Sequence, residues 1–363
     1  MSRLFPVLLI LILISGCNKE ESFFAWERTY GTGEARFIRV TADSGLITCG
    51  VLENQPYFMR LDENKTEIVN FSAGFSGVFT SAWYDTSGYI TAGSTNGTML
   101  LMRHSLTGRK IWEKSADPGF NIAQTQLLCL SNGDFLAIGS ESPDTTYDFQ
   151  TGLLFMRFDS TGQVLRELVF KSGLYIASYE AVIDNSDNIY LALTRKEAFA
   201  EPKATVAKFN SSLEKLWETE LSNNPAYGAA ALAIINDGSG GVYVAGRTEL
   251  PKEGGELINN SFIASVSGSG SLYWKKYPEN SNSGTGILLN SADEVLLLNS
   301  NCYIVNILDP SDGADGGRIR MFDVCDPYTT DAFGFDFDTD FNSDLILAGS
   351  LGGSFYLAVK AMD

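Results

Sequence analysis

The sequence predicts an all-β fold, a seven-bladed β-propeller with four antiparallel strands in each blade. The first observation is a repeat in which a short apolar run ends at a small residue. This residue recurs seven times, at Gly50, Gly93, Gly139, Thr194, Gly246, Asn299 and Gly349. The spacings of 43 to 55 residues match the length of a propeller blade. The second observation is that the apolar runs are short, rich in Val, Ile, Tyr and Phe, and bounded by Gly, Asn, Asp or Ser, without a sustained helical period.

The third repeat shows the expected order of strands within a blade. Its strands A to D are expected at residues 125–130, 135–139, 153–158 and 163–170, and the small residue after strand B is interpreted as a turn. Asn-Gly and Thr-Gly pairs between these runs supply the left-handed residues that tight hairpins need. One such sheet cannot bury both faces, so neighbouring blades must cover it.

The last repeat lacks a fourth strand. Residues 25–30 contain Trp26 and resemble the fourth strands that carry Trp112, Trp217 and Trp274. We expect this N-terminal segment to complete the last blade and to close the ring without open edges. The three tryptophans themselves are expected to pack between blades.

The first residues have the features of an export signal. Residues 1–16 combine one Arg with an apolar core at 8–14 that is too short to span a membrane, which is typical of a signal peptide. The segment Ile14-Ser15-Gly16-Cys17 resembles the bacterial lipobox, which implies cleavage before Cys17 and acylation of that cysteine. The expected organisation is a signal peptide at 1–16, a lipidated tether at 17–22 and a single propeller domain at 23–363.

The residues after Cys17 suggest a location. Absence of Asp at position 18 resembles the pattern sorted to the outer membrane, and Lys19-Glu20-Glu21 resembles the surface-export signal of Bacteroidetes lipoproteins. A plain solvated tether is the alternative. We expect a lipid-anchored protein of the outer membrane that faces either the cell surface or the periplasm.

The charge of the chain restricts its partners. Without residues 1–16 it has 25 basic and 44 acidic side chains, a formal net charge of −19. Such a chain is repelled by phosphate backbones and anionic headgroups. We therefore exclude nucleic acid as a partner, expect membrane contact through the lipid anchor only, and expect a monomer.

Four cysteines remain besides Cys17. Cys302 and Cys325 lie symmetrically about residues 313–314, the centre of a predicted hairpin, which would set them opposite each other. In an oxidising compartment this disulfide would add about 3 kcal/mol of stability. Cys49 and Cys129 fall in different blades and are expected to be buried free thiols.

The sequence has neither a motif for nucleophilic catalysis nor a zinc-binding motif. The single histidine, His104, stands where other repeats have large apolar residues, so we expect it to pack between sheets. The chain has no Gly-x-Ser-x-Gly motif and no zinc spacing of Cys and His, so we expect neither an enzyme nor a cofactor. The acidic stretches 336–344 and 309–317 have oxygen donors suited to calcium, but they align with ordinary turns of other blades, and both interpretations stay open.

The loops between strands B and C are long in three consecutive repeats, at 141–152, 195–203 and 248–260. Insertions on one face of a repeat array usually mark the binding side. The predicted ligand-binding residues here are Tyr147, Phe149, Arg195, Phe199 and Arg247. The connections between blades add Phe120, Tyr175 and Tyr227, which either form an aromatic collar around the channel mouth or fill gaps between blades.

Two segments resemble known repeats. Residues 185–192 resemble the repeat of bacterial extracytoplasmic propellers, and residues 105–112 resemble the Thr-Gly-x-x-x-Trp segment of quinoprotein-type repeats. Quinoprotein enzymes commonly have eight blades and a dedicated cofactor site, and neither is traceable in this sequence. The resemblance implies binding, scaffolding or catalysis without choosing among them. The expected anchor, the uneven loops and the lack of catalytic motifs predict a non-catalytic binding or adhesion module for a glycan, peptide or protein. The alternatives are a scaffold lipoprotein that binds other envelope proteins and, third, an enzyme that acts through carboxylates on the loop face.

Overall fold

The computed structural model describes residues 25–141, 152–171, 175–196, 200–221, 228–251, 257–278, 283–290, 292–299, 304–320, 332–339 and 344–360. All regular secondary structure in these ranges is β-strand. In the same ranges no helix has the length and apolar character needed to cross a membrane. The strands are β1 (Trp26–Val40), β2 (Leu46–Leu52), β3 (Gln55–Leu61), β4 (Glu67–Ser72), β5 (Val78–Asp85), β6 (Gly88–Thr95), β7 (Thr98–His104), β8 (Lys110–Ala116), β9 (Ile122–Cys129), β10 (Phe135–Glu141), β11 (Gly152–Phe158), β12 (Val164–Lys171), β13 (Tyr175–Ile183), β14 (Ile189–Lys196), β15 (Lys203–Phe209), β16 (Lys215–Glu220), β17 (Ala229–Asn236), β18 (Val242–Pro251), β19 (Leu257–Val266), β20 (Leu272–Lys276), β21 (Gly284–Leu289), β22 (Val295–Asn299), β23 (Ile304–Leu308), β24 (Asp315–Arg320), β25 (Ala332–Thr339), β26 (Leu345–Leu351) and β27 (Ser354–Lys360).

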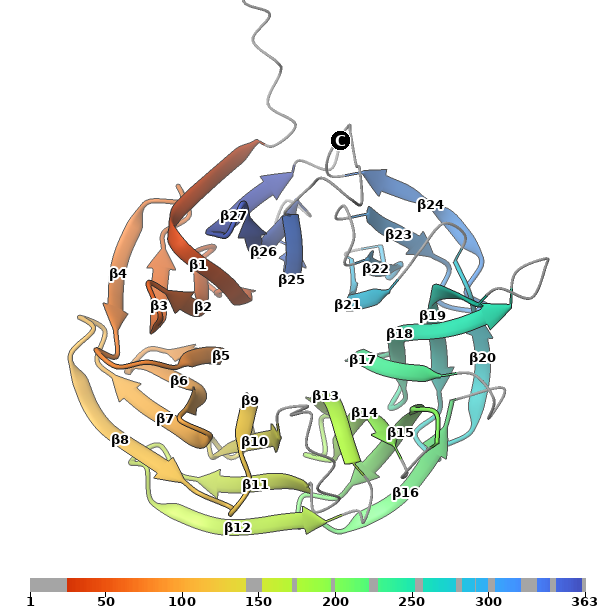
Figure 1. The fold of residues 1–363 in the computed structure, drawn as a ribbon, viewed down its shortest axis with the longest axis horizontal. Helices are drawn as coiled ribbons and strands as arrows, with labels where there is room; N and C mark the ends of the chain where they lie inside the picture. The colour runs from red at the N-terminus through yellow and green to blue at the C-terminus, as the bar shows by residue number, and fades with distance from the viewer. Residues whose placement is uncertain are drawn as a thin grey trace, which may run out of the picture.

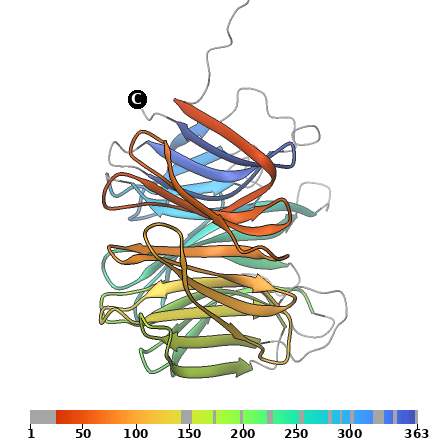
Figure 2. The ribbon, with the colours of Figure 1, turned by 90° about the vertical axis from the view of Figure 1, so that its left-hand side faces the viewer.

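The strands form antiparallel sheets arranged radially around a central axis (Figure 1). Five sheets have four strands in chain order, β5 to β8, β9 to β12, β13 to β16, β17 to β20 and β21 to β24. The first strand of each sheet lies nearest the axis and the fourth lies at the rim (Figure 1). Seen from the side, the sheets stack face against face (Figure 2). The predicted all-β propeller architecture is confirmed.

The sixth sheet has seven strands because β1 is long enough to serve two neighbours. Its first half pairs with β27, from Trp26 opposite Val359 to Thr32 opposite Ser354. Its second half, from Gly33 to Val40, pairs with β2. The order is therefore β25, β26, β27, β1, β2, β3, β4, and β1 joins the last strands of the chain to the first (Figure 1).

The recurring small residue lies within a strand, so the prediction that it forms a turn is wrong. Gly50 is in the middle of β2, and Gly246 is inside β18. The partner strand bulges at this level, which brings its backbone close. A Cβ at Gly50 would lie 2.0 Å from the carbonyl oxygen of Glu34, and one at Gly246 would lie 1.9 Å from that of Ala230. Glycine at these two positions therefore allows the close approach of two strands.

The tryptophans of the rim strands pack between sheets, as expected. Trp112, Trp217 and Trp274 each cover a glycine in a turn of the following sheet, which is Gly162, Gly270 and Gly313 respectively. Trp217 also donates from Nε1 to the carbonyl oxygen of Gly268, at 3.0 Å. His104 is buried too, with its ring stacked on Phe71 at 3.7 Å between ring centres.

Turn chemistry accounts for most of the acidic turns. Asp184 Oδ1 accepts hydrogen bonds from the backbone N–H groups of Ser186 and Asn188, both at 2.9 Å, and Asp309 serves its own turn in the same way. The stretch 336–344 is different, because Asp336 and Asp338 lie in β25. Assigning those two residues to a solvated turn is therefore wrong, and residues 340–343 lie outside the described part of the chain.

Candidate functional site: the central channel

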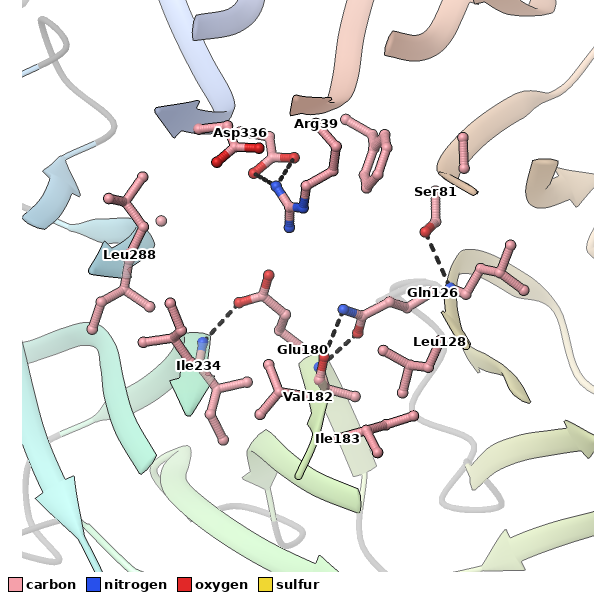
Figure 3. Close-up of a pocket in the computed structure, with 18 of the residues that line it drawn as sticks. Arg39, Ser81, Gln126, Leu128, Glu180, Val182, Ile183, Ile234, Leu288 and Asp336 are labelled. Carbon is pink, nitrogen blue, oxygen red and sulfur yellow. Dashed lines mark hydrogen bonds and ion pairs between the residues drawn. The ribbon is translucent and has the colours of Figure 1, made fainter. Parts of the chain in front are cut away.

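A cavity of about 400 Å³ lies at the centre of the ring (Figure 3). Its wall is formed by the strands nearest the axis, namely β5, β9, β13, β17 and β21 from the four-stranded sheets and β1 and β25 from the seven-stranded sheet. Where it lines the cavity, each of these strands pairs on one side only, so its inner edge carries N–H groups that need a partner. Side chains that line the cavity must therefore accept hydrogen bonds from these edge N–H groups.

Neighbouring innermost strands satisfy one another with side chains. Ser81 Oγ in β5 accepts from the backbone N–H of Leu127 in β9, at 3.1 Å. Gln126 in β9 accepts from the N–H of Ala181 in β13 at 2.6 Å and donates to the carbonyl oxygen of the same residue at 2.8 Å. An unpaired buried N–H would cost about 1 to 3 kcal/mol. These contacts therefore stabilise the channel wall and fix its side chains in place.

Carboxylates have the same role on the other side of the ring. Glu180 Oε2 in β13 accepts from the N–H of Ile234 in β17, at 2.7 Å. Asp336 Oδ2 accepts a hydrogen bond from the N–H of Ile38 in β1 at 2.9 Å. Asp338 Oδ2 accepts one from the N–H of Val40 in the same strand, also at 2.9 Å. Three carboxyl groups are thus held at the cavity wall.

Arg39 is the one cation that the described lining residues contribute. Its Nη1 lies 3.2 Å from Asp336 Oδ2 and 3.4 Å from Oδ1, and it donates to the carbonyl oxygen of Ile38 at 2.8 Å. The side chain of Arg39 is 43% accessible and that of Asp336 is 18% accessible. Figure 3 shows Arg39 and Glu180 extending into the cavity from opposite walls. The cavity therefore has one guanidinium group against three carboxyl groups.

Burial changes the acidity of these groups. Loss of hydration raises the pKa of Glu180 from 4.5 to about 8, and the charge of Asp336 adds to the rise, while the Ile234 N–H and Arg39 oppose it. Burial also raises the pKa of Asp336, although Arg39 opposes this. For Arg39, burial lowers the pKa, but Asp336 and Asp338 outweigh it and the pKa is raised. At pH 7 the Glu180 carboxyl group is therefore mostly protonated, and Arg39 is charged.

The rest of the wall is aromatic and aliphatic. Phe37 and Trp83 line the cavity from β1 and β5, and Leu128, Ile183, Ile235 and Leu288 line it from other strands. Cys129 also lines it as a free thiol, half-buried where full burial was expected, and partial burial raises its pKa. Cys49 is fully buried, as expected. Among the residues whose placement is described, no group of three or more His, Cys, Asp and Glu side chains is arranged to hold a metal ion.

The structure places three of the predicted binding residues away from the cavity wall. Arg195 lies in β14 and forms an ion pair with Glu218, with both side chains largely buried. Arg247 is exposed in β18, and Phe120 packs against a core cluster between two sheets. The predicted loop at 248–260 is in part a continuation of β18 and β19, with Leu250 opposite Ile258, so the expectation of an irregular loop is wrong there.

The remaining predicted residues cannot be placed. Outside the described residues lie Tyr147, Phe149, Phe199, Tyr227, Cys17, Cys302 and Cys325. For Tyr175 only the backbone, at the start of β13, is described.

Sequence reasoning missed Arg39 and Glu180, and it considered Asp336 and Asp338 only as part of an acidic stretch suited to calcium or to a turn. Their signal was present in the repeat, because the residues that β5, β9, β17 and β21 contribute to the same cavity include no Asp, Glu, Lys or Arg. A charged residue in an otherwise apolar strand next to the axis is the pattern that could have identified them.

Comparisons with known proteins show the fold of this chain and nothing further. No family model and no curated protein sequence matches the chain. Among solved structures, a catalytically inactive virginiamycin B lyase from Staphylococcus aureus with quinupristin has a TM-score of 0.65 at 11% identity, covering 93% of this chain and 99% of that one. The Pan2 WD40 domain of Neurospora crassa has a TM-score of 0.60 at 12% identity, covering 94% and 97%. BBS1N in complex with ARL6DN has a TM-score of 0.56 at 8% identity, covering 94% and 96%. At these identities the likeness shows a β-propeller fold and leaves the activity open.

Proposed function

We propose that this protein is a lipid-anchored binding module of the bacterial outer membrane, with its ligand site in the central channel of a seven-bladed propeller. Seven innermost strands around one cavity support the blade count. The double pairing of β1 supports closure of the ring by the N-terminal strand, since its first half supplies a fourth strand to β25, β26 and β27. The lipobox-like segment before Cys17 supports the anchor.

The observation that carries the proposal is a cavity of about 400 Å³ with charged side chains held at fixed positions in its wall. This volume falls within the range of about 300 to 1,000 Å³ typical of small-molecule sites. Placing carboxyl and guanidinium groups at the axis costs hydration free energy that an apolar plug would avoid. Charged side chains of Arg39, Glu180 and Asp336 around an open space therefore support a ligand site, beyond the stabilising contacts that the two carboxyl groups make with the wall.

The same geometry favours binding over catalysis. Glu180 and Asp336 are engaged by backbone N–H groups of neighbouring strands. In the described lining, the hydroxyl of Ser81 also accepts a backbone N–H, and the chain's single histidine is buried in a stack with Phe71 away from this wall. A nucleophile beside a general base is not formed among these residues.

The channel site can be tested by filling it. We would measure thermal shifts of the purified domain with a defined collection of amines, amino acids, short peptides and sugars. Leu128→Trp places extra volume in the cavity, and Leu165→Trp on the rim strand β12, where Leu165 is 47% exposed, is the matched control. Compounds that stabilise the wild type and the control by several degrees should lose their effect on Leu128→Trp. Ligands that bind all three proteins equally would exclude the channel.

The anchor is tested separately. Cells that express the wild type should incorporate labelled palmitate into the protein, and Cys17→Ser should abolish labelling and release the protein from the membrane fraction. A protease that cannot cross the outer membrane then distinguishes surface exposure from a periplasmic position. Labelling that survives Cys17→Ser would contradict the lipobox interpretation.

The loop face remains a second candidate for glycan, peptide or protein ligands. Its motivation is the long insertions of three consecutive repeats, which contain Tyr147, Phe149 and Phe199. Simultaneous replacement of these three by alanine should weaken binding of such a ligand if it contacts the loops. Co-purification with an envelope complex, unaffected by the channel-filling variant, would instead favour the scaffold role.

A further inference from the structure

The charges that line the cavity do not balance. Arg39 is paired with Asp336, whereas Asp338 and Glu180 have only backbone N–H groups as donors among the described residues. Glu180 uses Oε2 for that contact, and its side chain extends toward the opposite wall (Figure 3). Ionisation of Glu180 therefore leaves a carboxylate facing the cavity without a cationic partner at hydrogen-bond distance.

The cavity also offers aromatic surface beside these carboxyl groups. Phe37 lines it, and the guanidinium carbon of Arg39 lies 5.1 Å from the centre of the Phe37 ring. Trp83 lines it with 39% of its surface still accessible to water, although the ring meets Phe135 edge-on. Aromatic faces attract cations electrostatically, and exposed indole surface is stabilised by an apolar cover.

We propose that the channel binds an organic cation, a ligand that has one ammonium group on an apolar or aromatic body. This inference rests on the proposed function of the channel and specifies its ligand. The ammonium group is placed against the carboxylate of Glu180, and the apolar body lies against Phe37, Trp83 and Leu128. An anionic ligand would find only one cationic side chain among the described lining residues, Arg39, and Arg39 already forms an ion pair with Asp336.

Binding is coupled to a proton on Glu180. The free carboxyl group is mostly protonated at pH 7, since burial raises its pKa to about 8. The charged or titratable groups that face it are Arg39 from β1, Asp336 and Asp338 from β25 and Cys129 from β9; the described lining of β5, β17 and β21 is neutral. An ammonium group favours the ionised form of Glu180, so binding at pH 7 releases a proton to the solvent.

The test uses three probes of one shape and different charge, 2-phenylethylamine, 2-phenylethanol and phenylacetate, measured by isothermal titration calorimetry on the full mature chain. We expect the amine to bind once per chain at pH 7, at least tenfold more tightly than the other two. Glu180→Gln should weaken it tenfold or more, because glutamine keeps an acceptor for the Ile234 N–H but no charge. Glu113→Gln, in an exposed pair with Lys110 on β8, is the matched control and should bind as the wild type does.

Proton release gives a second readout. Titrations of the amine in buffers with different ionisation enthalpies should show close to one proton released at pH 7, less at pH 9, and none in Glu180→Gln. A structural role for Glu180 alone would not produce this pattern. Equal binding of alcohol and amine, preferred binding of phenylacetate, or an unchanged affinity of Glu180→Gln would each overturn the inference.

Failure of the inference and of the channel site can be told apart. If the alcohol or phenylacetate binds best and Leu128→Trp abolishes that binding, the channel is the site and the cation is excluded. If the amine binds equally to Leu128→Trp, both the channel and its cationic ligand are excluded. If none of the three probes binds, the organic cation is overturned, and the library screen with Leu128→Trp decides the channel.

Discussion

Asp336 is the residue whose removal most directly tests the channel wall. Its carboxylate accepts the Ile38 N–H at 2.9 Å and pairs with Arg39 Nη1 at 3.2 Å. Asp336→Ala leaves the N–H without its acceptor, which costs about 1 to 3 kcal/mol. Arg39 is 43% accessible, so loss of its partner adds about 0 to 1 kcal/mol, well below the cost in a fully buried pair.

These contributions are partly offset by removal of a poorly hydrated carboxyl group, since burial raises the pKa of Asp336. We expect a net loss of about 2 kcal/mol in the free energy of unfolding at pH 7. Asp336→Asn keeps an acceptor of the same shape and should lose about 1 kcal/mol or less.

The measurement is equilibrium unfolding in urea, followed by tryptophan fluorescence, with the midpoint compared at constant slope. Hydrogen exchange of the Ile38 amide reports the local effect and should accelerate in Asp336→Ala but little in Asp336→Asn. A stability within about 0.5 kcal/mol of the wild type, together with unchanged protection of Ile38, would refute the assigned role of the carboxylate.

Three further predictions follow from the same structure. Glu180 binds its proton more tightly in the folded state, so the free energy of unfolding should fall as the pH rises from about 5 to 8, by at most about 1.4 kcal/mol per pH unit. Urea unfolding at pH 5, 6.5 and 8 measures this dependence, which should be weaker in Glu180→Gln. Gly246→Ala brings a Cβ against a neighbouring carbonyl oxygen and should lower the free energy of unfolding by about 1 to 3 kcal/mol. Gly316→Ala should cost less, because its Cβ would lie 3.4 Å from the nearest atom, and similar melting temperatures for the two variants would contradict the close-approach argument. Trp217→Phe removes the 3.0 Å hydrogen bond to Gly268 and should cost about 1 kcal/mol beyond the lost contact area, whereas an unchanged urea midpoint would show that this bond is dispensable.

The repeat in the sequence was sufficient to predict the architecture. Short apolar runs with the spacing of a blade can bury both faces only by stacking on neighbours, so local pattern and global fold agree. Placement of the tryptophans followed from the same logic. The recurrent glycine was misinterpreted, because its cause is a bulge in the partner strand, and pairing across strands is not visible in a local window.

The candidate site depended on tertiary structure. Arg39, Glu180 and Asp336 come from strands far apart in the sequence, and only the arrangement of these strands around the axis brings the three residues to one cavity. Asp336 also lies in a run of alternating acidic residues that is equally typical of a turn. What makes it part of a strand is its pairing with β26 and its hydrogen bond from the Ile38 N–H in β1, and both contacts are non-local. The sequence by itself determined the repeat and the sheet-forming segments, because these depend on neighbouring residues. The tertiary structure decided which side chains face the axis and what charge they share, because that depends on how seven innermost strands surround a common space.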